Sequence, residues 1–543
     1  MTNNKQLTTL FQSYNWAELY EQVKDTEYDA NIPINQQSNL AIKAMLLVAW
    51  WSDNIYSKEL LNHFPLMMTE PLTHFAVTYG YICLGDIKKF QLYMSKPPKN
   101  YPKWMSSYLD IEISGRNLKF KRQMQIVQKL TSKNQYPKDY IKVAILQSLE
   151  HEKADITYLK EYIQNINLTE DDNPLSSLVC LKARIINIDN IDTQAFPILQ
   201  TRKAKYLFAK SEVLESLKAY DKVAQTKYLD INSINEWLSL AISIPQGKDS
   251  LLARVNFAIQ LVPNSLFVNG TIASYALIDS FFKKEYQTAY KIVQKYNKYR
   301  ELPKGKFTKN AQVFFKYILN LCIHWQHNQD LYKVVENVEE LHTFGESHTL
   351  SLSNINLTLN KQLYNCTSNF IMGIKMYHLS NPNSSHHAKC LIEHIGSIKH
   401  EGENLLFSIG EIDTRPDEGI WQVHLKKGKD LDEIIKITVD GYIEFLVINL
   451  KNKQLNSVTI QGTPAPNYAL VGDKDLEDEE GFLEMIQKVN ERMKISTLQQ
   501  GWNFLDVYSA TVGEDKKSNK KYHIDSYHLQ PLFYKDADKW LVS

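Results

Sequence analysis

Two patterns of hydrophobic and polar positions divide the chain near Tyr332. Before that point, apolar residues recur at helical spacing, Gly and Pro are sparse, and strand-like alternation is hard to find, so the pattern predicts one helix after another. The clearest predicted helices are Trp16–Val23, Leu40–Trp51, Lys205–Ala224, Leu251–Leu261, Phe267–Phe282 and Tyr286–Tyr296. Short polar breaks separate them, such as the turn expected at Lys283–Glu285.

Consecutive helices of similar size suggest a repeat architecture for this first part. Small residues such as Ala258, Ala273 and Ala289 stand where paired helices must approach closely. The pattern resembles tetratricopeptide-type helical hairpins, although the chain lacks their clean period of about 34 residues. Such hairpins bury their apolar faces by stacking into a solenoid. An irregular helical domain is the alternative interpretation.

From Tyr332 onward, strand-like and helix-like segments alternate. The predicted strands are Glu340–Phe344, Gln362–Ile371, Asn404–Ile409, Ser457–Gln461 and Trp502–Tyr508. The predicted helices are Ser385–Lys399, Leu431–Leu450, Gly481–Gln500 and Pro531–Leu541. This alternation predicts a parallel sheet covered by helices on both faces, with functional residues at the carboxyl ends of the strands. We therefore expect a helical region over residues 1–334 and an α/β domain over residues 335–543.

Composition and charge exclude several classes of protein. The 543 residues carry a formal net charge of +1, so no overall field favours nucleic acid or an anionic membrane. The five cysteines are scattered and form no CxxC pair, which argues against a disulfide framework and a zinc site. We see no secretory signal and no apolar stretch long enough to span a bilayer. We expect a protein of the reducing cytoplasm.

The first signal with chemical content is Phe344-Gly345-Glu346-Ser347-His348, directly after the first predicted strand. Gly allows a tight turn out of a strand, and a serine there can stand exposed near the start of a helix. The free N–H groups of a helix N-terminus favour an oxyanion. A helix-capping role for Ser347 is the simpler alternative.

The second signal is Asp525-Ser526-Tyr527-His528, which follows the last predicted strand. In a tight turn, the Asp525 carboxylate can reach one nitrogen of the His528 imidazole and leave the other nitrogen to accept a serine hydroxyl. The remaining histidines, His342, His348, His378, His386 and His387, show no metal-ligand spacing. We interpret them as surface or packing residues and expect no metal.

Together these two segments resemble the SGNH (GDSL-like) hydrolase family over about residues 335–543. That resemblance implies a flavodoxin-like three-layer α/β fold and a catalytic triad of Ser347, His528 and Asp525. It also implies an oxyanion hole formed by the backbone N–H groups of Ser347 and Gly373. The segment Gln461-Gly462-Thr463-Pro464-Ala465-Pro466 resembles the proline-rich loop that many members place beside the pocket.

The chain departs from the family at two positions. Glu346 replaces the usual Asp beside the nucleophile, and Ile412 replaces the Asn whose side chain normally binds the oxyanion. Loss of one such donor lowers the rate by about 10²–10³-fold. Arg415, Asn369 and Asn467 are candidates for a substitute donor. Gly410 and Asp413 are candidates for supporting the loop or the site.

The resemblance implies acyl transfer through an acyl-serine, with no tightly bound cofactor. The lack of an export signal and the cytoplasmic location of acetyl-CoA favour transfer to a sugar hydroxyl. An SGNH domain joined to helical repeats also resembles proteins that decorate bacterial surface polysaccharides, so the resemblance implies an O-acetyltransferase acting on hydroxyls of such a polysaccharide. It would be cytoplasmic, or peripheral at the inner membrane with a polysaccharide-assembly complex, and its helical repeats would offer a surface for a protein partner. Two alternatives remain open: a carbohydrate acetyl esterase, and a non-catalytic scaffold with a degenerate SGNH domain.

Overall fold

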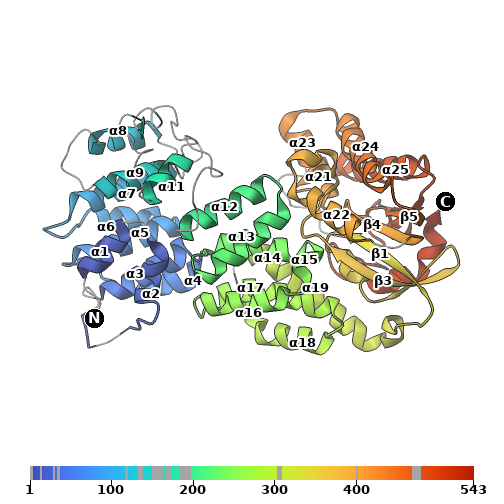
Figure 1. The fold of residues 1–543 in the computed structure, drawn as a ribbon, viewed down its shortest axis with the longest axis horizontal. Coiled ribbons are helices and arrows are strands. Elements are labelled where there is room, and N and C mark those ends of the chain that lie inside the picture. The colour runs from blue at the N-terminus through green and yellow to red at the C-terminus, as the bar shows by residue number, and fades with distance from the viewer. Residues whose placement is uncertain are drawn as a thin grey trace. The chain divides into compact units, whose positions relative to one another are not determined.

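The computed structural model of the chain contains two compact units (Figure 1). It describes residues 4–12, 15–28, 31–33, 37–116, 120–131, 138–149, 160, 163–164, 174–182, 197–302, 308–398, 401–467 and 478–543. The first unit comprises Met1–Tyr206, Ala219–Ile234 and Leu261–Asn269. The second comprises Leu207–Lys218, Asn235–Gln260 and Gly270–Ser543.

Helices make up the described part of the chain before the first strand. They are α1 (Asn4–Gln12), α2 (Trp16–Val23), α3 (Ser38–Ala49), α4 (Asn54–Leu61), α5 (Pro71–Leu84), α6 (Ile87–Met94), α7 (Lys103–Arg116), α8 (Phe120–Thr131), α9 (Lys138–Leu149), α11 (Pro174–Lys182), α12 (Pro197–Ala209), α13 (Val213–Gln225), α14 (Ile231–Ile242), α15 (Pro245–Lys248), α16 (Leu251–Leu261), α17 (Leu266–Phe282), α18 (Tyr286–Lys295), η4 (Asn297–Glu301), α19 (Thr308–His327) and η5 (Gln329–Tyr332). The prediction of successive helices is confirmed.

Local signals explain where several of these helices begin and end. Glu70 caps α5 by accepting from the Thr73 N–H, and Pro71 occupies its first turn. Gly85 ends α5 in the left-handed region with φ 76°, where a residue without Cβ is favoured. Asp86 then caps α6 through the Lys89 N–H. This Gly-Asp pair makes a sharp turn between two helices.

One predicted helix is wrong, because Lys205–Ala224 forms the end of α12 and most of α13. The chain turns at Ser211, which has a left-handed φ of 62°. The Glu212 N–H donates to the Leu207 carbonyl across this turn. No Gly or Pro stands in the segment 210–212, so the helical pattern runs through the turn without a break.

A seven-stranded sheet forms the centre of the C-terminal part. Its strands are β1 (Glu339–Gly345), β2 (Asn356–Leu359), β3 (Gln362–Phe370), β4 (Glu403–Ser408), β5 (Leu455–Gln461), β6 (Asn503–Leu505) and β7 (Leu541–Val542). Their order in the sheet is β2-β3-β1-β4-β5-β6-β7. The pairs β1–β3, β1–β4, β4–β5 and β5–β6 are parallel, whereas β2 and β7 pair antiparallel at the two ends. The α/β prediction with a mostly parallel sheet is confirmed.

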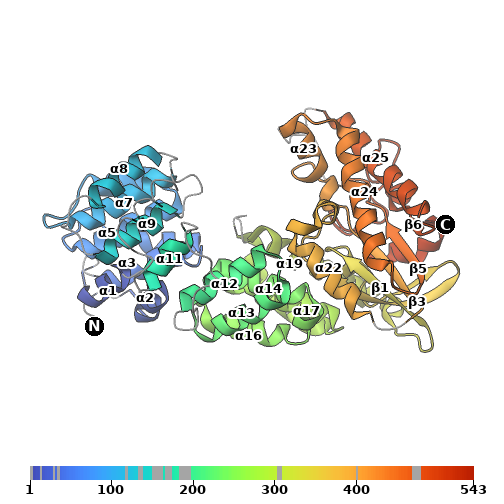
Figure 2. The same cartoon turned by 45° about the horizontal axis from the view of Figure 1, so that its top comes forward.

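The helices that accompany this sheet are shown in Figure 2. They are α20 (Thr349–Leu352), α21 (Met376–Ser380), η6 (Pro382–Ser384), α22 (His386–Ser397), η7 (Ile412–Thr414), α23 (Gly419–Lys427), α24 (Leu431–Leu450), α25 (Glu479–Leu498), α26 (Val507–Thr511) and η8 (Pro531–Trp540). Helix α24 packs against α21 and α25. The predicted helix Ser385–Lys399 is found over His386–Ser397, and Lys399 itself lies outside the described residues.

Three details of the α/β part differ from the prediction. The strand expected at Trp502–Tyr508 stops at Leu505, because Asp506 caps α26 by accepting from the Ser509 N–H. The closing helix from Pro531 is a 3-10 helix. The hairpin between β2 and β3 was not predicted, since its turn residues Asn360 and Lys361 both adopt positive φ without a glycine.

Helices from before the first strand belong to the same compact unit as the sheet. Phe282 on α17 and Phe314 on α19 both contact the ring of Phe370 at the end of β3, with ring centroids 5.8 and 6.0 Å apart. The Met372 N–H just beyond β3 donates to the Ser243 hydroxyl. These contacts place part of the helical region next to the carboxyl ends of the parallel strands.

Candidate active site

The strand-to-loop turn at Gly345 positions Ser347 at the carboxyl end of β1. A Cβ on Gly345 would lie 2.0 Å from the Ser408 carbonyl oxygen at the end of β4, so only glycine allows this close approach of backbones. The Thr349 N–H and hydroxyl both donate to the Glu346 carbonyl, which closes the turn. Ser347 thus stands between β1 and α20 with 9% of its surface exposed.

The Asp525–His528 segment meets Ser347 from the loop between α26 and η8. The imidazole Nε2 of His528 lies 2.8 Å from the Ser347 Oγ, and its Nδ1 lies 2.8 Å from the Asp525 Oδ2. The Asp525 Oδ1 also accepts the backbone N–H groups of Tyr527 and His528, both at 2.8 Å. The structure therefore brings all three predicted residues together, although 181 positions separate Ser347 from His528.

The Asp525 carboxylate is held in its charged form. Burial alone would raise its pKa, but the neighbouring His528 and the two backbone N–H donors together bring the pKa well below the usual range. A charged carboxylate on Nδ1 fixes the tautomer of His528 that leaves Nε2 facing Ser347. This is the arrangement in which an imidazole can take a proton from a hydroxyl.

Glu346 provides a second acceptor for the same serine hydroxyl. Its Oε2 lies 2.6 Å from the Ser347 Oγ, slightly closer than the His528 Nε2. A hydroxyl has one hydrogen, so Ser347 donates either to the carboxylate of Glu346 or to the imidazole of His528. The Asp-to-Glu departure noticed in the sequence thus directly contacts the candidate nucleophile.

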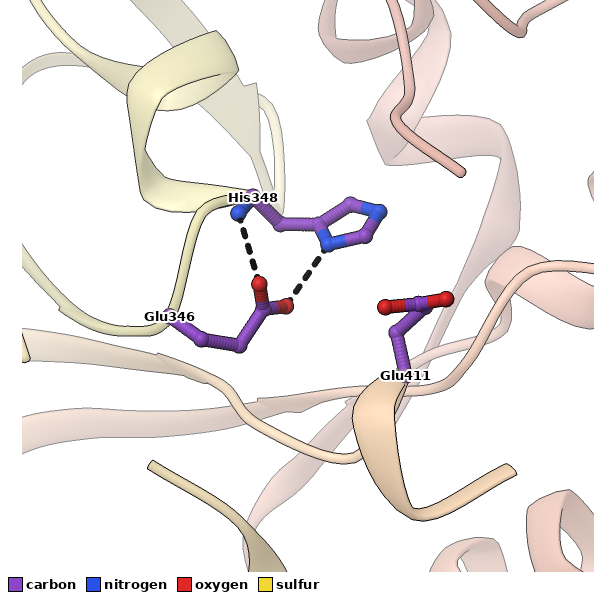
Figure 3. A group of neighbouring side chains, drawn as sticks. All are labelled: Glu346, His348 and Glu411. Atoms are coloured by element: carbon purple, nitrogen blue, oxygen red, sulfur yellow. Dashed lines mark hydrogen bonds and ion pairs between the residues drawn. The ribbon is translucent and has the colours of Figure 1, made fainter. Parts of the chain in front are cut away.

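A buried ion pair continues from this carboxylate to His348 (Figure 3). The His348 Nδ1 lies 2.6 Å from the Glu346 Oε1, and its Nε2 lies 3.1 Å from the Tyr527 carbonyl. Burial opposes both charges, but the close contact between the two groups lowers the pKa of Glu346 well below its usual range and raises the pKa of His348. His348, expected to be a surface or packing residue, is buried beside the candidate triad, and both of its ring nitrogens face oxygen atoms, which favours its charged form.

Glu346, His348 and Glu411 form one group with ligand atoms close enough to hold a metal ion, all within 4.8 Å of one another. In Figure 3 the Glu411 carboxylate faces the Glu346–His348 pair. However, the Glu411 carboxylate accepts from the Arg415 Nε and Nη2, the latter at 2.6 Å. A proton between His348 and Glu346 and the guanidinium of Arg415 already supply the positive charge beside these carboxylates. We therefore assign no metal to this group.

The glycine expected in the oxyanion hole follows the carboxyl end of a parallel strand. Gly373 follows β3 and has a left-handed φ of 74°. The Ile371 N–H donates to the Gly345 carbonyl, which ties the end of β3 to the turn that carries Ser347. Asn369 lies one residue before the end of β3, in register with Phe344. The end of β3 is therefore bonded to the end of β1, from which Ser347 follows two residues later.

Two of the candidate donors are engaged in other contacts. The Arg415 guanidinium binds Glu411 and Glu418, and it lies 4.7 Å from the centroid of the Tyr527 ring. The Asn467 amide donates to the Asp525 backbone carbonyl at 2.8 Å, so it supports the triad segment. Both side chains thus hold neighbouring residues of the site in place.

Gly410 and Asp413 support the loop after β4. Gly410 has a φ of 143°, and a Cβ there would lie 3.0 Å from the Thr463 methyl group. The buried Asp413 carboxylate accepts the Met376 N–H at 2.8 Å and the Tyr377 N–H at 3.2 Å, which caps α21. Burial raises the pKa of Asp413 to about 7, against the effect of these hydrogen bonds. Asp413 thus links the loop after β4 to the start of α21.

Sequence reasoning missed one side chain that touches the site. Tyr317 on α19 stacks on His528, with ring centroids 3.8 Å apart and planes inclined by 8°. It stands in the helical region, outside any motif, so no local pattern could connect it to His528.

A separate cavity of about 530 Å³ lies within the first unit. Its lining includes the aromatic rings of Trp16, Tyr79 and Tyr228 and the cationic side chains of Arg116, Arg202 and Lys205. Its size falls in the range of about 300–1,000 Å³ found for small-molecule sites.

No helix in the described ranges combines the length and the apolar character needed to cross a bilayer. Comparison with protein-family models, with curated proteins and with solved structures gives no match for this chain.

Proposed function

We propose that the chain is a serine-dependent acyl-transfer enzyme in which Ser347 is the nucleophile, His528 the general base and Asp525 the residue that orients the base. One observation carries this proposal: the unbroken series of contacts from the Ser347 Oγ through both nitrogens of His528 to the Asp525 carboxylate, each about 2.8 Å long. A nucleophile, a base and a carboxylate in this order activate a hydroxyl at neutral pH.

The reaction proceeds through two acyl transfers. His528 Nε2 takes the Ser347 proton while the Oγ attacks the acyl carbonyl, and the bond from that carbonyl to the donor's oxygen or sulfur then breaks. His528 returns the proton to the leaving group. In the second half, His528 takes a proton from an acceptor hydroxyl, whose oxygen attacks the acyl carbonyl of the acyl-serine. The bond from that carbonyl to the Ser347 Oγ then breaks, and His528 returns the proton to the Oγ.

Two backbone N–H groups, those of Ser347 and Gly373, would stabilise the oxyanion. The position of the third donor in the SGNH family is held by Ile412, an apolar and largely buried residue. Because Arg415 and Asn467 face other partners, the chain would work with fewer donors, and we expect a slower acyl-transfer step than three donors would give.

The strand order supports assignment to a flavodoxin-like SGNH fold. Numbered along the chain, the five parallel strands have the order 2-1-3-4-5, which is the flavodoxin-like order. The candidate nucleophile follows the first of them and Glu411 follows the third, at the point where the order reverses. Ligands of open α/β sheets bind at this point.

The acyl group we propose is acetyl, delivered from acetyl-CoA in the cytoplasm to hydroxyls of a bacterial surface polysaccharide. The cavity of the first unit, where aromatic rings stand beside the ion pairs Arg116–Glu112 and Lys205–Asp230, is a candidate place for the polysaccharide. Hydrolysis of acetyl esters is the alternative outcome of the same acyl-serine. A scaffold role is favoured by one observation, the contact of Glu346 with the Ser347 hydroxyl, which competes with the base.

Turnover of p-nitrophenyl acetate tests the reaction class. We expect release of p-nitrophenol by the wild-type chain, a loss of at least about 10³-fold in Ser347→Ala, and a loss of about 10³–10⁴-fold in Asp525→Asn. Asp515→Asn, at an exposed position, is the matched control and should retain full activity. Equal turnover by the wild type and Ser347→Ala would refute the assignment and favour the scaffold.

Incubation with radiolabelled acetyl-CoA and candidate bacterial polysaccharides separates transfer from hydrolysis. We expect label on the sugar hydroxyls that depends on Ser347. Release of free acetate alone, again dependent on Ser347, would replace the transferase by the esterase.

A further inference from the structure

An aromatic residue from the helical region covers one face of the His528 imidazole. Tyr317, on α19, is fully buried, and its ring lies parallel to that of His528 at a centroid distance of 3.8 Å. Such a stack leaves the edge of the imidazole open. Nδ1 and Nε2 lie in the plane of the ring, where they meet Asp525 and Ser347.

Hydrogen bonds fix the tyrosine in this place. Its Oη lies 2.5 Å from the Ser351 Oγ, and the Ser351 hydroxyl in turn contacts the Leu529 carbonyl. Because a carbonyl only accepts, Ser351 donates to Leu529 and Tyr317 donates to Ser351. The phenol is therefore tied to the backbone of the residue that follows His528.

The backbone on the other side of His528 is held as well. The His348 Nε2 donates to the Tyr527 carbonyl at 3.1 Å. Helix α19 makes a second contact with this loop, because the Asn320 amide faces the Ile524 carbonyl at 3.4 Å. The loop that carries the base is thus held from α19, from Ser351 and from His348.

The chemistry of the stack favours the charged form of the imidazole. An aromatic ring carries negative partial charge on its face, and a cation within about 6 Å of that face is attracted. His528 becomes such a cation when it takes the Ser347 proton. Burial keeps the phenol neutral by raising the pKa of Tyr317 well above its ordinary value. In the described part of the chain, the other ionisable groups near His528 include Asp525, Glu346, His348, His523 and Tyr527.

We infer that Tyr317 is a positioning residue of the acyl-transfer site, which orients the His528 ring and stabilises the imidazolium formed during the reaction. The helical region accordingly completes the active site and is more than a binding surface. This inference rests on the proposed function.

Two substitutions at Tyr317 test the inference. Tyr317→Phe keeps the ring face and loses only the hydroxyl contact with Ser351. Tyr317→Leu removes the ring face. Tyr299→Leu is the matched control, because Tyr299 is another fully buried tyrosine of the same unit whose hydroxyl contacts Thr271. Each variant is assayed as the full chain, with kcat, KM and the pH profile measured on p-nitrophenyl acetate.

We expect Tyr317→Phe to retain kcat within about threefold, and Tyr317→Leu to lose about 10-fold or more in kcat with KM little changed. The acid limb of the kcat/KM profile should move to lower pH in Tyr317→Leu by about half a unit, because the imidazolium loses its aromatic partner. Tyr299→Leu should be less stable yet keep the wild-type kcat and profile. The inference is overturned if Tyr317→Leu also keeps the wild-type kcat and the wild-type pH profile.

A readout without turnover separates this inference from the proposed function. In protein with 13C-labelled histidine, the ring current of a stacked tyrosine shifts the His528 Hε1 resonance upfield. We expect this shift in the wild type and Tyr317→Phe and its loss in Tyr317→Leu. An inactive wild type that shows this shift would refute the proposed enzymatic function but leave the stack of Tyr317 on His528 intact. An active wild type that lacks the shift would refute only the role of Tyr317.

Discussion

At Ser347, a single hydroxyl hydrogen stands between a carboxylate and an imidazole. The Glu346 Oε2 and the His528 Nε2 are 2.6 and 2.8 Å from the same oxygen. For attack on an acyl group, the hydrogen must be directed to His528, because this residue can then pass the proton to the leaving group. The His348 imidazolium helps, since it neutralises Glu346 and makes that carboxylate a weaker competitor.

Asp413 makes the stability of the folded chain depend on pH in a way that does not involve the triad. Burial raises the pKa of its carboxyl to about 7. The folded chain therefore binds this proton more tightly than the unfolded chain, and the associated stability is present below about pH 4 and lost as the pH rises toward 7. Asp413→Asn keeps an acceptor for the α21 cap but cannot ionise.

We expect the unfolding free energy of the wild type, relative to Asp413→Asn, to fall between pH 4 and pH 7 in urea titrations. Asp413→Ala is the control for the cap itself and should be less stable than Asp413→Asn by about 1 kcal/mol at every pH. If the unfolding free energies of the wild type and Asp413→Asn varied with pH in parallel, the Asp413 carboxyl would ionise alike in the folded and the unfolded chain.

At the scale of the element, the end of β1 depends on one glycine. Gly345→Ala would place a methyl group 2.0 Å from the Ser408 carbonyl oxygen. The two nearest atoms, the oxygen and the carbon of this carbonyl, belong to the backbone and cannot turn away. We expect a loss of about 2–3 kcal/mol in the free energy of unfolding, together with a lower rate at Ser347, which β1 positions. Urea unfolding and p-nitrophenyl acetate turnover measure the two effects.

Gly396→Ala on α22 is the matched control, because a Cβ there meets no atom within 4 Å. It should raise stability by up to about 1 kcal/mol, as alanine favours a helix. If both glycine variants behaved alike, the close approach of β1 and β4 would not require Gly345.

The elements that the sequence predicts well are those whose own pattern is long and regular. Leu431–Leu450 was expected as a helix and is found as α24 with these ends, since its apolar spacing and the Asp430 cap agree. The hidden break in Lys205–Ala224 and the β2–β3 turn depend instead on Ser211, Asn360 and Lys361 in left-handed conformations. Ser and Lys rarely adopt positive φ and give no sign of such a turn, and Asn360 is a weak sign because no glycine follows it.

At the scale of the whole molecule, the pairing of Ser347 with Asp525 and His528 is implied by the resemblance to the SGNH family, and the expected position of both segments at the carboxyl side of a parallel sheet agrees with it. The sequence could not predict Tyr317, since the contact between α19 and the His528 loop arises from packing between segments about 200 positions apart and leaves no motif. Packing between distant segments also explains a second difference. The hydrophobic pattern changes near Tyr332, but the second compact unit already includes helices that precede this residue.

The central claim is that Ser347 is an activated nucleophile, and the most direct measurement is covalent labelling with a fluorophosphonate followed by mass spectrometry of the peptides. We predict one labelled residue, Ser347, with labelling abolished in Ser347→Ala and slowed in Asp525→Asn. Folded wild-type protein that takes up no label, or that is labelled at a site unaffected by Ser347→Ala, would contradict the account.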